Sequence, residues 1–218
     1  MSVWVIIPVK PLKLAKSRLA AVISPDQRQE FAQTLLRHTL EVVQNVPTVT
    51  GTLVISRDTK ALSIARDYKA YTVMESGTPE LNAALMRATQ VVAGWHAEAV
   101  LILPSDLPLL ASEDVSSMIA MGREHQTVVI ATDQHEDGTN AMMVRPAGLF
   151  PYAYGPGSYH RHIDLAKQSG AAVKAYHSER MLLDIDLPED LERYLQLSTN
   201  DSEMKRDLWN SLLSDNAS

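Results

Sequence analysis

The sequence predicts an α/β fold, a single-domain three-layer sandwich built on a mostly parallel sheet. Short apolar runs of strand length alternate along the chain with longer amphipathic runs of helix length. This alternation is typical of βαβ units, in which helices cover both faces of a parallel sheet. The chain has 218 residues, 45% of them hydrophobic, which suffices for one large core of this kind.

Seven apolar runs are expected to form or lead into strands. They cover residues 3–7, 52–56, 71–74, 99–103, 127–131, 141–144 and 172–176. Pro8 is expected to end the first strand, because proline cannot donate a hydrogen bond to a neighbouring strand. The run at 99–103 is the most apolar, so it should lie at the centre of the sheet.

The helices are predicted from apolar spacing and from their start signals. Ser24 is a good N-cap with Pro25 at the first helical position, and apolar side chains continue that helix to Val43. Ser112 is expected to cap another helix. Further helices are predicted at residues 58–68, 81–95 and 159–168, and one begins near Leu187.

The main domain is assigned to residues 1–198, and the polar residues 199–218 form a tail. Apolar side chains recur in that tail, so it is either a short amphipathic helix that docks on the body or on a partner, or a frayed end.

Composition excludes several functional classes. The formal net charge is -6, which argues against a general nucleic-acid or anionic-membrane binder. The absence of cysteine excludes disulfides, thiolate zinc sites and cysteine nucleophiles. No run approaches the ~20 apolar residues of a membrane span, and the N-terminal run is too short for a signal peptide. We therefore expect a cytoplasmic enzyme.

A basic loop follows the first predicted strand. Lys10, Lys13, Lys16 and Arg18 lie within it, with no acidic residue among them. Ligands of open parallel sheets bind beyond the carboxyl ends of the strands, and these cations could offset the charge of a nucleoside triphosphate. A solvated surface loop is the alternative. The loop lacks the P-loop spacing, and it lacks the glycine pattern of dinucleotide-binding enzymes.

Three aspartates are candidate ligands of Mg²⁺. Asp106 follows the most apolar strand, and Asp184 and Asp186 would point to the same face of an extended segment. Mg²⁺ is commonly held by one or two carboxylates together with phosphate oxygens. Alternatively, Asp106 belongs to an ordinary proline-rich turn, and Asp186 only caps the helix that starts at Pro188.

Two glycine-containing turns are candidate anion sites. They span residues 137–140 and 155–158, and the second leads into a helix that begins near Ser158. Backbone N–H groups at a helix N-terminus favour a phosphate or carboxylate. Each turn could equally be an ordinary loop. His160 and His162, which follow, are expected to face solvent rather than to bind metal.

Six segments together resemble the 2-phospho-L-lactate and phosphoenolpyruvate guanylyltransferases of coenzyme F420 biosynthesis. The segments occur in order between residues 3 and 197 and read PVKPLKLAKSRL, LNAAL, PSDLPL, DGTNAMMV, GPGSYHRH and DIDLPEDL. That family belongs to the nucleotidyltransferases with a nucleotide-diphospho-sugar transferase-like, or glycosyltransferase-A-like, fold, which this chain is then expected to share.

The resemblance implies transfer of GMP from GTP to the phosphate of a small C3 phospho-acid, with release of pyrophosphate. It implies Mg²⁺ as the cofactor and a homodimer as the assembly. Phosphoenolpyruvate and 2-phospho-L-lactate both remain open as acceptors. A metal-dependent glycosyltransferase of the same fold and a non-enzymatic GTP-binding subunit are the alternatives.

The resemblance also implies roles for individual residues. Lys10, Lys16, Arg18, Asn82 and Asp106 would bind the nucleotide, and of these Lys16, Arg18 and Asp106 would take part in catalysis. Thr139, Gly155 and Ser158 would bind the phospho-acid. Asp106, Asp184 and Asp186 would bind Mg²⁺.

Overall fold

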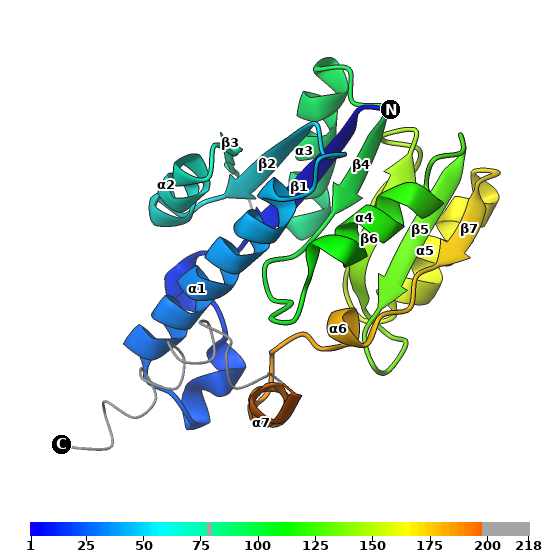
Figure 1. Ribbon diagram of the computed structural model, residues 1–218. Helices are drawn as coiled ribbons and strands as arrows, with labels where there is room; N and C mark the ends of the chain where they lie inside the picture. The colour runs from blue at the N-terminus through cyan, green and yellow to red at the C-terminus, as the bar shows by residue number, and fades with distance from the viewer. Residues whose placement is uncertain (78–79, 198–218) are drawn as a thin grey trace.

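A seven-stranded sheet organises the fold (Figure 1). The computed structural model describes residues 1–77 and 80–197. The strands lie in the order β3-β2-β1-β4-β6-β5-β7. Their bounds are β1 Val3–Val9, β2 Gly51–Ser56, β3 Tyr71–Met74, β4 Ala99–Ile102, β5 Thr127–Thr132, β6 Thr139–Arg145 and β7 Ala172–Ala175. Only β6 runs antiparallel to its neighbours β4 and β5, so the mostly parallel sheet is confirmed, with β4 at its centre.

Helices cover both faces of the sheet and give the three predicted layers (Figure 1). One face carries α1 (Pro25–Gln44), α2 (Thr59–Asp67) and α4 (Ser112–Met121). The other carries α3 (Leu81–Gly94) and α5 (Ser158–Gln168). None of the described helices combines the length and apolar character that a membrane crossing requires.

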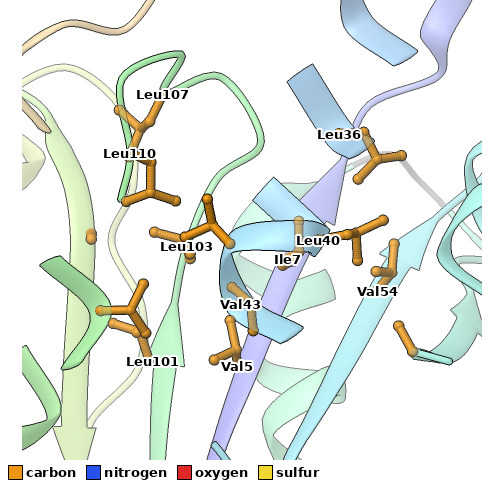
Figure 2. Packing of buried hydrophobic residues seen from close by; sticks show 14 of the residues in the cluster. Val5, Ile7, Leu36, Leu40, Val43, Val54, Leu101, Leu103, Leu107 and Leu110 are labelled. Carbon is orange, nitrogen blue, oxygen red and sulfur yellow. The ribbon is translucent and has the colours of Figure 1, made fainter. Parts of the chain in front are cut away.

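The face under α1 holds the larger part of the core (Figure 2). Val5 and Ile7 of β1 point toward Leu40 and Val43 of α1, and all four side chains are at most 2% exposed. Val54 of β2 and Leu101 and Leu103 at the end of β4 extend the same apolar layer to either side. This packing fixes the carboxyl ends of β1, β2 and β4 relative to one another.

Pro8 does not end β1, in contrast to the prediction. The strand continues to Val9, with Pro8 opposite Ile55 of β2. The carbonyl of Ile6 accepts a bond from Leu103 on the β4 side, and alternation along the strand turns Pro8 to that same side. Because β4 ends at Ile102, the missing N–H of Pro8 faces no strand partner, and the proline is tolerated.

The helix starts are only partly as predicted. Ser24 caps α1 in a reciprocal capping box with Gln27. Ser112, however, is the first helical residue rather than the cap of α4. Ala111 occupies the cap position, and the Asp114 carboxylate accepts its backbone N–H.

Short elements that the periodicity did not predict lie beyond the carboxyl ends of the strands. They are the 3-10 helices η1 (Leu12–Leu14) and η2 (Ser17–Ala21) and the short helix α6 (Glu179–Leu182). The last described helix, α7 (Pro188–Leu197), packs with η2 and α1 around Leu19, Phe31, Leu191 and Tyr194. This small second core joins the basic loop to the aspartate-bearing segment. The predicted tail at 199–218 lies outside the described residues.

Asp58 links α2 to the basic loop. One carboxylate oxygen caps α2 by accepting from Lys60 and Ala61, and the other accepts the N–H of Leu12 at 2.8 Å.

We predict that Asp58→Ala lowers the free energy of unfolding by roughly 2 kcal/mol, because it removes an N-cap and a charge-assisted bond. Urea denaturation measures this loss. The matched control is Asp67→Ala in the last turn of α2, where the exposed acid has no favourable interaction with the helix dipole. Equal losses in the two variants would contradict the linking role.

Candidate functional site

The carboxyl edge of the sheet brings the predicted site segments together. The basic loop follows β1, Asp106 follows β4, and Asn82 lies in the first turn of α3 after β3. Thr139 starts β6, and because β6 is antiparallel, its first residue lies at this same edge. The topology therefore collects residues that are up to 170 positions apart in the sequence.

Lys16 occupies the centre of this edge. It joins η1 to η2 in a left-handed backbone conformation, with φ 53° and ψ 34°. A lysine adopts this conformation only where the surrounding structure stabilises it. Its side chain is only 7% exposed, whereas Lys10 and Lys13 of the same loop are exposed. The structure thus singles out one of the predicted basic residues.

The ammonium group of Lys16 bridges two of the predicted metal ligands. Its Nζ lies 3.3 Å from Asp106 Oδ2 and 3.3 Å from Asp186 Oδ1. Burial alone would lower the pKa of Lys16, but the two carboxylates outweigh it and the pKa is raised. Arg18 is 69% exposed and lies 3.7 Å from the other oxygen of Asp186. Asp186 is therefore not simply a helix cap, and Lys16 is charged at neutral pH.

Asp184 has an excess of negative charge around it. Burial, followed by the charges of Asp106 and Asp186, raises its pKa to about 6, although Lys16 acts in the opposite direction. A divalent cation suits this set of carboxylate oxygens and would relieve the repulsion. Within residues 1–77 and 80–197, however, no three His, Cys, Asp or Glu side chains already form a group that could hold a metal ion. Mg²⁺ binding by Asp106, Asp184 and Asp186 stays a prediction.

A buried ionic network positions the segment that carries Asp184 and Asp186. Asp114 of α4 is fully buried and accepts from Tyr176, Ser178 and Arg180 at 2.7–2.9 Å. Those bonds outweigh the effect of burial and lower the pKa of Asp114.

Further bonds hold the same segment from the other side. Asn140 of β6 donates to the carbonyl of Met181 at 2.8 Å, and the N–H of Ile185 donates to the carbonyl of Asp106 at 3.3 Å. The carboxylate of Asp190 accepts the N–H groups of Asp186 and Leu187. The two aspartates are thus held beside Asp106 through backbone bonds.

Thr139 and Ser158, the predicted acceptor ligands, contact each other. The N–H of Thr139 donates to Ser158 Oγ at 3.0 Å, and Ser158 Oγ donates to Thr139 Oγ1 at 3.2 Å. His162 was expected to face solvent, but it is fully buried and its Nδ1 lies 2.9 Å from Thr139 Oγ1. Burial, helped by the positive charge of Arg161, lowers the pKa of His162 to about 4, so the ring is neutral near pH 7.

The N-terminus of α5 differs from the open anion site that the sequence predicted. Gly157 is the N-cap, with φ 71°, and Ser158 is the first helical residue. The N–H of Gly157 donates to the carboxylate of Asp137 at 3.0 Å, and the N–H of Tyr159 donates to its carbonyl. The N–H of Ser158 donates to Gly155. These backbone donors are used within the chain, so binding of a phospho-acid by Thr139, Gly155 and Ser158 stays a prediction.

Gly155 has a conformational reason to be glycine. Its φ of 126° is unfavourable for any other residue, and an added Cβ would lie 3.5 Å from the guanidinium of Arg161. That guanidinium in turn donates to the carbonyls of Ala153 and Pro156. The turn is thus built around Arg161.

Asn82 holds the same loop from α3. Its Oδ1 accepts the N–H of Tyr154 at 2.7 Å, and its Nδ2 donates to the carbonyl of Tyr154 at 3.3 Å. Asn82 therefore has a positioning role, and direct contact with a nucleotide stays a prediction. Sequence reasoning missed the structural roles of Asp58, Asp114 and Asp137, although Asp58 could have been recognised as the N-cap of α2, and it placed His162 wrongly in solvent.

Comparisons with known proteins decide the family. A family model described as guanylyl transferase CofC like matches residues 3–210. The chain belongs to this family. This chain is 36% identical to a protein of Rubrobacter xylanophilus named phosphoenolpyruvate guanylyltransferase, over 88% of this chain and 93% of the relative. A relative of the same name from Roseiflexus castenholzii is also 36% identical, over 88% and 87% of the two chains. The predicted family and the predicted enzyme class, a nucleotidyltransferase, are confirmed.

Solved structures confirm the predicted fold. A protein of Desulfovibrio desulfuricans described as a nucleotide-diphospho-sugar transferase superposes with a TM-score of 0.77 at 15% identity, covering 100% of this chain and 96% of the other. A cytidylyltransferase of Leptospira borgpetersenii superposes with a TM-score of 0.61, also at 15% identity and with the same coverage. At these identities the likeness concerns the fold alone, which is the predicted nucleotide-diphospho-sugar transferase-like one.

The raised pKa of Asp184 predicts that its ionised carboxylate destabilises the metal-free fold. Without metal, Asp184→Asn should raise the free energy of unfolding at pH 7 by roughly 1–3 kcal/mol. With Mg²⁺ and substrates present, the same substitution should abolish turnover. The folded-state pKa of about 6 lies above the ordinary 3.8. Stability from the protonated Asp184 is therefore present below about pH 4 and lost as the pH rises through about 6, so the gain in the variant should vanish near pH 4.

Urea denaturation in EDTA at pH 4 and pH 7 measures this difference. The matched control is Asp186→Asn, which removes a carboxylate paired with Lys16 and should give no gain. An Asp184→Asn variant that is less stable than the parent at pH 7 would show that the ionised Asp184 carboxylate does not destabilise the fold.

Proposed function

We propose that this enzyme moves GMP from GTP to the phosphate of phosphoenolpyruvate. An acceptor phosphate oxygen attacks the α-phosphorus of GTP, a new O–P bond forms, and the bond between the α-phosphorus and the oxygen that bridges to the β-phosphorus breaks. Pyrophosphate leaves with that oxygen. The name of the relatives favours phosphoenolpyruvate as the acceptor. 2-Phospho-L-lactate is the second candidate, and coenzyme F420 biosynthesis is the proposed pathway.

The single observation that carries this proposal is the alternation of fixed charges at the carboxyl edge. Lys16 lies between Asp106 and Asp186, and Arg18 lies beside Asp186. A triphosphate needs cations at its oxygens, and the acceptor brings further negative charge. A site that is basic on the β1 side and acidic on the β4 side can hold phosphates on one side and a divalent cation on the other.

Positioning and charge neutralisation carry most of the catalysis in this scheme. A phosphate monoester is already ionised at neutral pH, so the acceptor needs no strong general base. Lys16 is buried and restrained by two ion pairs, which makes it a preorganised donor toward developing phosphate charge. Arg18 is exposed and can swing from Asp186 to a nucleotide phosphate.

Asp106, Asp184 and Asp186 are the residues that would hold Mg²⁺. The bound ion would offset phosphate charge and stabilise the pyrophosphate leaving group. Without the ion, Lys16 offsets part of the negative charge of these three carboxylates, and the charge that is not offset helps to raise the pKa of Asp184. The cytoplasmic location and the homodimer stay proposals of the same kind.

Pyrophosphate release tests the proposed function directly. The enzyme is incubated with GTP, Mg²⁺ and either phosphoenolpyruvate or 2-phospho-L-lactate, and pyrophosphate is measured over time. We expect release with phosphoenolpyruvate, GTP as the preferred nucleotide, and a loss of at least 100-fold in Asp106→Asn, in line with the removal of an electrostatic group at a reacting centre.

Pyruvate and lactate, which lack the phosphate, are the matched acceptors that should give no release. Hydrolysis of a GDP-sugar in the same assay, with no pyrophosphate from GTP, would instead support a glycosyltransferase. GTP binding without any turnover would support a non-enzymatic subunit.

A further inference from the structure

We propose that His162 is a positioning residue that fixes the hydroxyl of Thr139 as a hydrogen-bond donor toward the anionic acceptor. The inference rests on the proposed function and concerns the side of the site that binds the phospho-acid. It is carried by the directions of four hydrogen bonds among buried groups.

The tautomer of His162 follows from one of these bonds. The backbone N–H of Ala153 donates to His162 Nε2 at 2.9 Å. A backbone amide is always a donor, so Nε2 accepts and carries no hydrogen. In a neutral ring the hydrogen is then on Nδ1, which lies 2.9 Å from Thr139 Oγ1. His162 therefore donates to Thr139.

The surroundings keep the ring in this orientation. The ring of Tyr154 packs edge-on at 4.7 Å from the ring of His162, and Phe150 lies at 6.5 Å. Rotation of the ring by half a turn would remove both of its hydrogen bonds inside a fully buried environment, which is unfavourable. The tautomer and the orientation are thus determined together.

Ser158 supplies the second donor to Thr139. Ser158 Oγ accepts the N–H of Thr139 and donates its own hydrogen to Thr139 Oγ1 at 3.2 Å. Both lone pairs of Thr139 Oγ1 are then occupied, one by Ser158 and one by His162. Only the hydroxyl hydrogen of Thr139 is left to form another bond.

That hydrogen has a role only if a ligand accepts it. Among the hydrogen bonds of residues 1–77 and 80–197, none takes Thr139 Oγ1 as the donor to an acceptor of the chain. A hydroxyl that accepts two hydrogen bonds is a stronger donor. Thr139 starts β6 at the carboxyl edge, so the donor lies where the acceptor's phosphate or carboxylate would bind. Because Thr139 Oγ1 can donate but cannot accept a further hydrogen bond, it favours an anionic ligand group over a neutral one.

Two isosteric replacements separate the two functions of the ring. In His162→Gln the amide reaches the Nε2 position and keeps an acceptor for Ala153, but it loses the donor to Thr139. In His162→Asn the amide nitrogen lies near the Nδ1 position and keeps the donor, but it loses the acceptor for Ala153. We expect His162→Gln to raise the KM for phosphoenolpyruvate at least 10-fold with the KM for GTP within 2-fold. For His162→Asn we expect both values within about 3-fold of the parent.

A double-mutant cycle tests whether His162 acts through Thr139. Thr139→Val alone removes the hydroxyl, and adding His162→Gln should then leave the KM for phosphoenolpyruvate unchanged. If the two substitutions instead multiply their separate effects on the KM for phosphoenolpyruvate, the proposal is overturned. A folded His162→Gln variant with an unchanged KM for phosphoenolpyruvate would also overturn it. A purely structural role predicts instead that both His162 variants change the two KM values in proportion to their loss of melting temperature.

The tautomer of His162 can be measured without an activity assay. Long-range ¹H–¹⁵N correlation of the histidine rings at pH 7 should show one ring with its hydrogen on Nδ1, and these signals should be missing from the His162→Gln spectrum. A hydrogen on Nε2 of His162 would overturn the inference. If the parent enzyme releases no pyrophosphate with either phospho-acid, the proposed function fails, whereas release together with the wrong tautomer defeats this inference alone.

Discussion

The contact of Lys16 with Asp106 and Asp186 is the interaction on which the site depends. It joins the loop after β1, the turn after β4 and the segment before α7, which are three distant parts of the chain. A buried ammonium is stable only with such partners, and carboxylates this close together need a cation. The left-handed backbone at Lys16 and the second core around Leu19 and Tyr194 lie beside that contact and help to hold the loop in place.

The two sides of the edge are built on different physical principles. The proposed nucleotide and metal side is held by charge, and negative charge is in excess there, which raises the pKa of Asp184. The proposed acceptor side is held by neutral, directed hydrogen bonds among Thr139, Ser158 and His162. Charge can be rearranged when a polyanion and a divalent cation enter, whereas the hydrogen-bonded side keeps its geometry. This division suits an enzyme that must accept a flexible triphosphate and select a small acid.

Much of the fold could be predicted from the sequence, because strand and helix periods are local signals. All seven strands fall on the predicted runs, and β4 is central because an apolar run is stable only when covered on both faces. The antiparallel direction of β6 and the passage of β1 through Pro8 depend on neighbouring strands, which a local pattern does not contain.

The candidate site was predictable in composition but not in geometry. Asp106, Asp184 and Asp186 could be selected from their places after strands and in motifs, yet nothing local indicated that Lys16 rather than Lys10 or Lys13 would be buried between them. The burial of His162 and the use of the α5 donors by Asp137 are likewise tertiary effects. Asp114 was missed because a buried acid is recognisable only once Arg180 and Tyr176 are seen around it.

In the proposed site, Lys16 supplies positive charge that a bound divalent cation would share at this edge. The most direct measurement is the melting temperature of Lys16→Met with and without Mg²⁺, beside that of Lys13→Met, which changes an exposed residue of the same loop. We expect a large loss of melting temperature for Lys16→Met in EDTA, recovery of most of that loss when Mg²⁺ is added, and little change for Lys13→Met. A loss for Lys16→Met that is the same with and without Mg²⁺, or no loss at all, would contradict this role of Lys16.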